Sequence, residues 1–227
     1  IGMLVGLVVY SLLTAFAFSW LNAGAVLLIL PLIFILFILE LYQKEETPFQ
    51  QIALQVLGVV YVAIPFGLYH FINLYPIGGA YHFKPWLLVG IFILIWSNDT
   101  FAYLFGSTLG KHRLFERISP KKSWEGTIGG GLSTFGIAWI LGTYTQTLTL
   151  GSWIILAAII VPTAIFGDLV ESMIKRDAAS KDSSSSIPGF GGILDVIDSP
   201  LAPAPAAFAF FYFYELFVSD YTFFGNY

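Results

Sequence analysis

Seven long apolar runs dominate this chain and restrict it to one kind of fold. A helix needs about 20 apolar residues to cross the roughly 30 Å hydrocarbon core of a bilayer. Hydrophobic residues make up 57% of the 227 positions and charged residues only 11%, which is too apolar for a soluble domain. Strands of a membrane β-barrel would be shorter and alternate in polarity, so we predict an all-α, polytopic membrane helix bundle. The seven predicted membrane-spanning helices are 3–20, 22–42, 50–71, 86–107, 124–145, 152–170 and 200–218.

The predicted organisation separates plain helices from a region that carries polar motifs. Residues 1–85 read as N-terminal transmembrane helices, and we expect their start to be trimmed from a longer chain because Ile1 enters the membrane without an initiator Met. Residues 86–227 read as the functional region, with polar loops at 108–123 and 171–199. The absence of cysteine from the sequence excludes disulfides and thiolate chemistry.

The distribution of cations predicts the orientation in the membrane. Of the ten Lys and Arg residues, only Lys84 lies outside the loops 43–49, 108–123 and 171–199. The positive-inside rule makes these three loops cytoplasmic. Because the two larger loops also hold carboxylates, we predict a site for a polyanion at the cytoplasmic face.

Two polar groups interrupt apolar runs, and ionisable residues at membrane depth are costly and usually functional. Asp99 shares a helical face with Trp96 and Tyr103 and should point into the protein. The alternative is a cluster of hydrogen bonds between helices. Asp168 begins a polar stripe with Glu171, Ser172 and Lys175, for which the alternative is a solvated helix face.

Two loop segments suggest ligands for a phosphate and for a metal ion. A helix is predicted to begin at or just after Ser119-Pro120, so that Lys121 and Lys122 in its first turn would bind an anion. The alternative is a basic patch touching lipid headgroups. Asp195 and Asp198 lie three residues apart after a glycine-rich loop. Hard oxygen ligands beside phosphate-binding cations favour Mg²⁺, with Asp168 and Asp195 as its carboxylates.

These segments together resemble the signature of the phosphatidate cytidylyltransferases, also called CDP-diacylglycerol synthases. The resemblance lies in Ser172-x-x-Lys175-Arg176-x4-Lys181-Asp182-x5-Pro188-Gly189-x-Gly191-Gly192-x-x-Asp195-x-x-Asp198, and in the stretches 98–106 and 119–126. Phe190 and Val196 depart from the family's His and Arg, so the roles of those two residues do not transfer.

The resemblance implies an Mg²⁺-dependent transfer of CMP from CTP to phosphatidate, giving CDP-diacylglycerol and pyrophosphate in phospholipid biosynthesis. The implied partners are CTP, phosphatidate and the lipid bilayer, with no nucleic acid and with a homodimer left open. The implied location is a bacterial inner membrane, with the site facing the cytoplasm.

On this interpretation three groups of residues form the site. The catalytic group is Asp168, Lys175, Arg176, Lys181, Asp182 and Asp195. The substrate-binding group is Asn98, Asp99, Lys111, Ser119, Lys121, Lys122, Ser123, Ser172, Gly191 and Gly192. The metal-binding group is Asp168, Asp195 and Asp198, with Asp99 as a further candidate.

Three other functions stay open from the sequence. A CTP-dependent lipid or polyprenol kinase would transfer the γ-phosphoryl group instead of CMP. A CDP-alcohol phosphotransferase also uses paired Asp residues, but its longer Asp-Gly-x-x-Ala-Arg framework is not found in this sequence. A cation or solute transporter would use Asp99 and Asp168 as an ion path.

Overall fold

The computed structural model describes residues 1–43, 46–74, 76–77, 80–81, 84–177 and 199–218. They divide into a first unit, residues 1–84 and 214–227, and a second unit, residues 85–213. Each predicted apolar run contains a helix, and the strands are short, so the all-α prediction is confirmed over the described residues.

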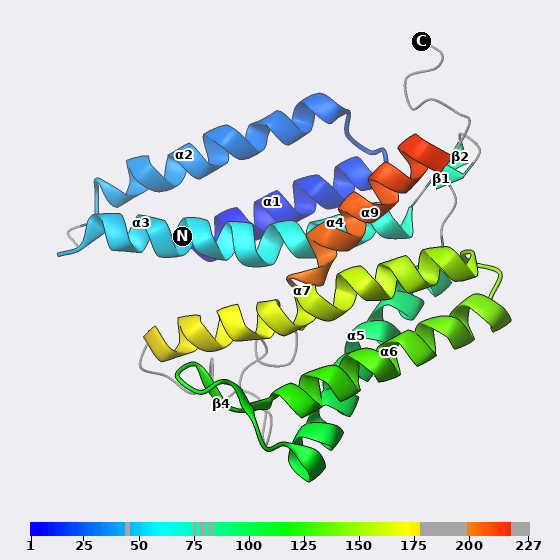
Figure 1. The fold of residues 1–227 in the computed structure, drawn as a ribbon. Coiled ribbons are helices and arrows are strands. Elements are labelled where there is room, and N and C mark those ends of the chain that lie inside the picture. The colour runs from blue at the N-terminus through cyan, green and yellow to red at the C-terminus, as the bar shows by residue number, and fades with distance from the viewer. Residues whose placement is uncertain (44–45, 75, 78–79, 82–83, 178–198, 219–227) are drawn as a thin grey trace. The chain divides into compact units, whose positions relative to one another are not determined.

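The first unit is built from one continuous helix and two interrupted ones (Figure 1). Its elements are α1 (Gly2–Ala17), the 3₁₀-helix η1 (Ala23–Leu28), α2 (Ile29–Glu40), α3 (Pro48–Gly58), the π-helix η2 (Val59–Ala63), α4 (Ile64–Asn73), β1 (Pro76–Ile77) and β2 (Ala80–Tyr81). The run predicted as one helix over 50–71 thus contains a π turn, placed just before Pro65, which cannot donate a backbone hydrogen bond.

The core of the first unit follows the helical period. The buried residues of α1 recur every fourth position as Val5, Val9, Leu13 and Ala17, so one stripe of the helix faces its neighbours. Val5, Val9 and Leu13 form a core with residues from α2 and η2. Gln55 Nε2 also donates to Glu40 Oε2 at 3.2 Å, which connects α3 to α2 by a polar contact typical of membrane helices.

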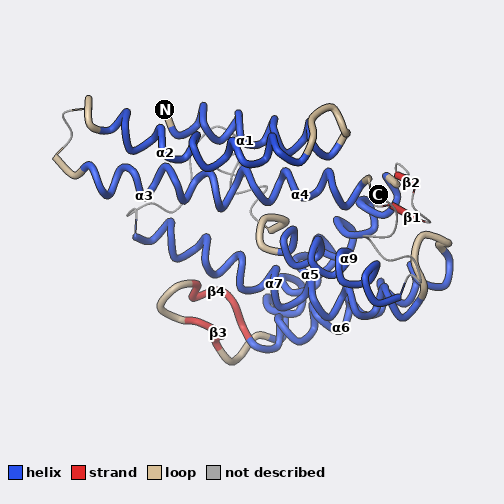
Figure 2. The backbone as a smooth tube through the Cα atoms, turned by 90° about the horizontal axis from the view of Figure 1, so that it is seen from above, coloured by secondary structure: helices blue, strands red, loops and turns tan. Residues whose placement is uncertain are grey.

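The second unit holds three helices side by side and a hairpin at one of their ends (Figures 1 and 2). Its elements are α5 (Pro85–Leu109), β3 (Arg113–Phe115), β4 (Ser119–Ser123), α6 (Trp124–Tyr144), α7 (Leu150–Asp177) and the first residues of α9 (Pro203–Val218). The strands β3 and β4 pair antiparallel with an irregular register. Helix α7 continues to Asp177, past the end of its predicted span, so the segment predicted as the loop 171–199 begins as helix.

Glycine lets α5 and α6 approach closely where the hairpin leaves them. A Cβ atom on Gly126 would lie 2.6 Å from the Ala102 carbonyl oxygen and 2.9 Å from Gly106 Cα. A Cβ on Gly130 would lie 2.7 Å from the Asn98 carbonyl oxygen. Small residues at such spacings allow membrane helices to pack backbone against backbone. The glycine face of α6 therefore packs against α5 of the same chain.

This close contact predicts that Gly126→Ala destabilises the protein. The added methyl group meets backbone atoms of α5, which cannot turn aside as a side chain can, so we expect the free energy of unfolding to fall by about 1–3 kcal/mol. Reversible unfolding in detergent, followed by circular dichroism, measures the loss.

The control for Gly126→Ala lies on the same helix. A Cβ on Gly136 has no atom within 4 Å, so Gly136→Ala should keep or slightly raise the stability through the helix propensity of alanine. Equal stability of the two variants would contradict the close α5–α6 contact.

The helices of this chain have the length and composition of membrane spans. Four of them are long and apolar enough to cross a bilayer: Ala23–Glu40, Pro48–Asn73, Pro85–Leu109 and Leu150–Asp177. Large apolar side chains such as Leu30, Phe34 and Leu132 lie 64–70% exposed, as expected for surfaces that face lipid. The chain is therefore an integral membrane protein.

Candidate active site

A cavity of about 510 Å³ lies in the second unit, where α5, β4, α6 and α7 come together. Helices α5 and α7 supply its carboxylates, and the hairpin supplies its cations. The residues that line it are Asn98, Asp99, Ala102, Tyr103, Gly106 and Ser107 from α5, Gly110, Arg113, Lys121, Lys122 and Ser123 from the hairpin segment, Gly126 and Thr127 from α6, and Ile165 and Asp168 from α7. Its volume is in the range of small-molecule sites.

The hairpin shows that the helix predicted to begin at or just after Ser119-Pro120 begins later in the chain. The prediction placed Lys121 and Lys122 in the first turn of a helix, but both lie in strand β4, and α6 begins at Trp124. Ser123 is the N-cap, because its side chain accepts a hydrogen bond from the Gly126 N–H at 3.2 Å. The strand is favoured because Trp124 N donates to the carbonyl oxygen of His112 across the hairpin at 2.9 Å.

A carboxylate in the first turn of α6 closes the base of the hairpin. Glu125 accepts hydrogen bonds from the backbone N–H groups of Lys111 at 3.1 Å and His112 at 3.2 Å. His112 Nδ1 lies 2.6 Å from Glu125 Oε1. These contacts hold the end of α5 against the start of α6, and therefore fix the backbone from which Lys121 and Lys122 extend.

The electrostatics of the cavity combine both signs of charge. Arg113, Lys121 and Lys122 stand against Asp99 and Asp168. Lys122 Nζ forms an ion pair with Asp168 Oδ2, and both side chains are partly exposed. Such a surplus of cations is suited to a ligand with several negative charges.

The oxygen atoms in the cavity fit a hard divalent cation. Asn98 is 2% exposed, and its Oδ1 has no hydrogen-bond partner among the described residues. Together with the carboxylates of Asp99 and Asp168 it forms a set of oxygen donors of the kind that Mg²⁺ takes. No group of three His, Cys, Asp or Glu side chains that could hold a metal ion is found within the described ranges. The predicted ligands Asp195 and Asp198 lie outside those ranges.

The structure brings together six of the residues predicted from the sequence. Those that line the cavity are Asn98, Asp99, Lys121, Lys122, Ser123 and Asp168. Those that are described but do not line it are Lys111, Ser119, Ser172, Lys175 and Arg176. Those that fall outside the described residues are Lys181, Asp182, Gly191, Gly192, Asp195 and Asp198.

Several cavity residues were not selected from the sequence. Arg113 is the most important, because it adds a third cation, and its place in the basic loop 108–123 was the available signal. Tyr103, Ser107 and Thr127 add polar groups. Tyr103 shares the helical face of Asp99, which was the signal for it, whereas no local pattern distinguishes Ser107 and Thr127 from ordinary helix residues.

A second ion pair lies further along α7. Lys175 Nζ and Glu171 Oε2 are 2.7 Å apart, and the Glu171 side chain is only 2% exposed. The polar stripe predicted on this helix therefore does not form a solvated face at Glu171. A buried carboxylate of this kind is stable only with its partner in place.

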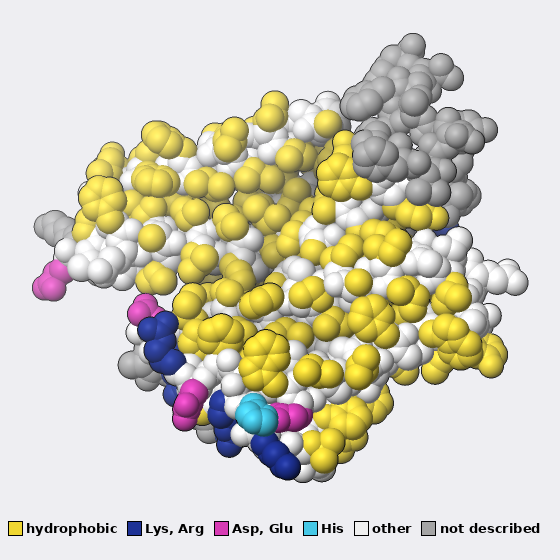
Figure 3. All heavy atoms as spheres, in the orientation of Figure 1, with side chains coloured by type: hydrophobic (Ala, Val, Ile, Leu, Met, Phe, Trp, Pro, Cys, Tyr) yellow, Lys and Arg dark blue, Asp and Glu magenta, His cyan; other side chains and the backbone are white. Residues whose placement is uncertain are grey.

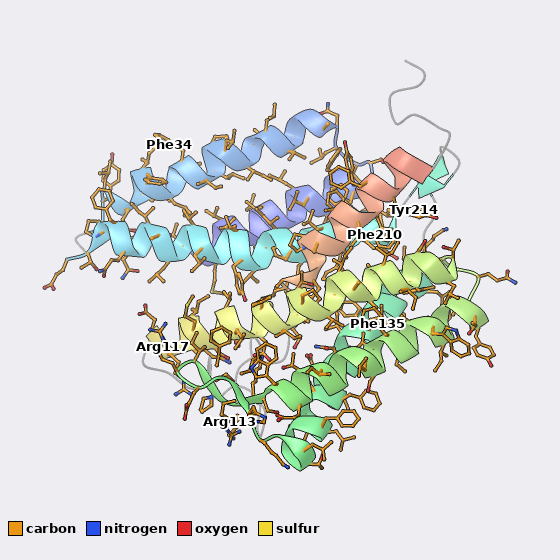
Figure 4. All side chains as sticks on the ribbon, viewed as in Figure 1. Phe34, Arg113, Arg117, Phe135, Phe210 and Tyr214 are labelled. Carbon is orange, nitrogen blue, oxygen red and sulfur yellow. The ribbon has the colours of Figure 1, made fainter. Side chains whose placement is uncertain are left out.

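The charged side chains of the second unit gather at one end. On the face drawn in Figure 3 they cluster around the β3–β4 hairpin and the last turns of α7, whereas the flanks of α6 and α7 are apolar. Figure 4 shows Arg113 and Arg117 on the hairpin and Phe135 along α6. Arg113, Lys121 and Lys122, which line the cavity, thus belong to the polar end of an otherwise apolar group of helices.

The chain matches the model of a known protein family over most of its length. The model of the cytidylyltransferase family matches residues 1–214. The chain belongs to this family. The resemblance inferred from its motifs is thereby confirmed at the level of the family.

Three relatives show how far the family likeness extends. A phosphatidate cytidylyltransferase of Rickettsia bellii is 34% identical over 195 residues, which are 81% of this chain and 82% of that protein. The phosphatidate cytidylyltransferase of Haemophilus influenzae is 44% identical over 135 residues, which are 57% of this chain and 46% of that protein. Phosphatidate cytidylyltransferase 4, chloroplastic, of Arabidopsis thaliana is 42% identical over 137 residues, which are 59% of this chain and 35% of that protein. This chain therefore spans less than half of the latter two proteins.

Proposed function

We propose that this chain transfers CMP from CTP to phosphatidate, giving CDP-diacylglycerol and pyrophosphate. The observation that carries the proposal is the cavity in which Arg113, Lys121 and Lys122 meet Asp99 and Asp168 at the polar end of membrane helices. Membership of the cytidylyltransferase family and the names of the relatives support the same reaction.

The reaction needs charge neutralisation more than it needs a strong base. The phosphate monoester of phosphatidate has a second pKa near about 6, by analogy with phosphorylated side chains, so it is mostly dianionic at neutral pH. One of its oxygens attacks the α-phosphorus of CTP, the bond from that phosphorus to the bridging oxygen breaks, and pyrophosphate leaves with the electron pair. The attacking oxygen carries no proton that a side chain must remove.

The cations of the hairpin would bring the two anions together. Arg113, Lys121 and Lys122 reach the cavity from one side, whereas Asp99 and Asp168 lie on helices α5 and α7. Arginine binds two phosphate oxygens through its planar fork, and lysine acts as a compact point charge on a long stem. Together they would lower the repulsion between phosphatidate and the triphosphate and stabilise the leaving pyrophosphate.

Asp168 is the first candidate to hold Mg²⁺, with Asp99 and the Asn98 amide oxygen beside it in the cavity. Asp195 and Asp198, which lie outside the described residues, are the further carboxylates that the motif suggests. The bound ion would supply charge neutralisation at the phosphate oxygens. The chain's own part is to fix these oxygen atoms on packed helices.

The lipid and the nucleotide would reach the cavity from different directions. The loop 108–123, which contains the hairpin, carries five of the ten Lys and Arg residues, and the positive-inside rule places such a loop in the cytoplasm. CTP would enter from that side, and the acyl chains of phosphatidate would stay in the bilayer. With bacterial relatives such as those of Haemophilus and Rickettsia, the proposed location is a bacterial inner membrane. Seven spans and a homodimer stay predictions.

A labelling experiment tests the reaction. The purified chain in phosphatidate-containing nanodiscs receives Mg²⁺ and CTP labelled on either the α- or the γ-phosphate, with EDTA as the control. We expect the α label in a lipid product and the γ label in pyrophosphate. A γ-labelled lipid would identify a kinase instead, and ion uptake by liposomes without consumption of CTP would identify a transporter.

A further inference from the structure

The ion pair between Lys122 and Asp168 joins a predicted phosphate ligand directly to a predicted metal ligand. The Lys122 ammonium lies on Asp168 Oδ2, and the two side chains are 25% and 32% exposed. Lys121 and Arg113 line the same cavity, but neither pairs with a carboxylate within the part of the chain that the structure describes. The two neighbouring lysines of β4 therefore have different partners.

An ammonium and a divalent cation compete for the same carboxylate oxygen. A lysine bound to Asp168 Oδ2 places its positive charge where a metal ion would have to stand, and two cations so close would repel each other. The ammonium can move away while the strand stays in place. The four-carbon stem of the lysine is flexible, whereas the next residue, Ser123, is buried and is the N-cap of α6.

We propose that Lys122 exchanges with the divalent cation on Asp168 and that the released ammonium then binds a phosphate of the nucleotide. This inference rests on the proposed function, since it takes Asp168 as a metal ligand and CTP as the substrate. Its consequence is that the metal ion and the triphosphate bind cooperatively. The metal ion frees Lys122 to bind the nucleotide, and the nucleotide holds Lys122 away from Asp168, where the metal ion binds. Such coupling is reciprocal.

The size of the coupling follows from the exposure of the pair. Fully exposed ion pairs contribute little, whereas pairs shielded from water contribute more. With each side chain about a quarter to a third exposed, we expect Lys122 to weaken metal binding about tenfold in the absence of nucleotide. Once the metal ion is bound, the free ammonium should strengthen CTP binding by a similar factor.

Manganese binding provides a test that does not depend on activity. The full chain in detergent is titrated with Mn²⁺ without nucleotide, and free Mn²⁺ is measured by electron paramagnetic resonance. We expect Lys122→Met to bind Mn²⁺ about tenfold more tightly than the unaltered protein. The matched control, Lys121→Met, removes the same charge from the same cavity and should change the affinity by less than threefold. Asp168→Asn should lose this binding.

The second measurement follows labelled CTP by equilibrium dialysis. Lys122→Met should weaken CTP binding about tenfold in Mn²⁺ and less than threefold in EDTA, where Lys122 is engaged with Asp168. Lys121→Met should weaken CTP binding under both conditions. If Lys122→Met does not fold, Lys122→Arg replaces it, and its firmer pair should lower the affinity for Mn²⁺.

Specific outcomes would overturn the exchange. Equal Mn²⁺ affinities for Lys122→Met and Lys121→Met would do so, as would unchanged Mn²⁺ binding in Asp168→Asn or a raised affinity in Lys122→Arg. If the labelling experiment still yields the liponucleotide in that case, the exchange fails and the proposed function stands. If no liponucleotide forms, the proposed function fails, whatever the Mn²⁺ titration gives.

Discussion

We expect Asp168→Asn to lower the rate of liponucleotide formation by about 10²–10³-fold, the loss that follows when a charge-stabilising group is removed from a site of this kind. The substitution keeps the size of the side chain but removes the carboxylate that faces Lys122 in the cavity. It removes a candidate metal ligand at the same time. Initial rates with α-labelled CTP and phosphatidate in nanodiscs measure the effect.

The matched control for Asp168→Asn is a carboxylate on the same helix. Asp177 is the last residue of α7, is exposed, and does not line the cavity. Asp177→Asn should therefore keep the rate within about threefold, which is under about 0.7 kcal/mol in activation free energy. A normal rate in Asp168→Asn, with CTP consumption still dependent on Mg²⁺, would show that Asp168 has no role in the reaction.

We expect Lys175→Met to lower the free energy of unfolding by about 3 kcal/mol. Loss of the ammonium removes the ion pair in which Lys175 Nζ lies 2.7 Å from the buried Glu171 carboxylate. Removing one member of a buried pair costs about 3–5 kcal/mol, and the lower figure applies because the Lys175 side chain is 21% exposed. Reversible unfolding in detergent at pH 7 measures the change.

Two further variants separate the ion pair from a general effect of charge. Arg176 is exposed in the same turn, so Arg176→Met should change the stability by less than about 0.5 kcal/mol, as is usual for surface positions. The double variant Glu171→Gln with Lys175→Met removes both charges and should recover most of the loss. If Lys175→Met and Arg176→Met are equally stable, the Glu171–Lys175 ion pair contributes nothing to the free energy of unfolding.

Local patterns in the sequence were sufficient for the class of fold. A run of apolar residues forms a helix in a bilayer whatever its neighbours do, because the backbone must satisfy its own hydrogen bonds there. The helices therefore appear where hydropathy predicts them, with errors at their ends. The extension of α7 to Asp177, past the predicted end at residue 170, is such an error, whereas the π turn before Pro65 interrupts a run predicted as one helix.

The prediction from local sequence was wrong for the segment between α5 and α6. Ser119-Pro120 looks like the start of a helix, yet residues 119–123 pair with β3 as a strand. That pairing depends on contacts across the hairpin, including those of Glu125 with Lys111 and His112. Such contacts leave no period in the sequence, so Lys121 and Lys122 were assigned to the right loop but to the wrong element.

The sequence by itself determined that this is a helical membrane protein, that nine of its ten Lys and Arg residues lie in the segments 43–49, 108–123 and 171–199, and which family it belongs to. These properties depend on hydropathy, on residue counts and on the spacing of short motifs, all of which are local. Only the tertiary structure decided that Lys122 meets Asp168, that Arg113 joins the cavity and that Glu171 is buried beside Lys175. Those contacts depend on how closely α5, α6 and α7 pack and on where the hairpin returns, and neither is encoded at any single position.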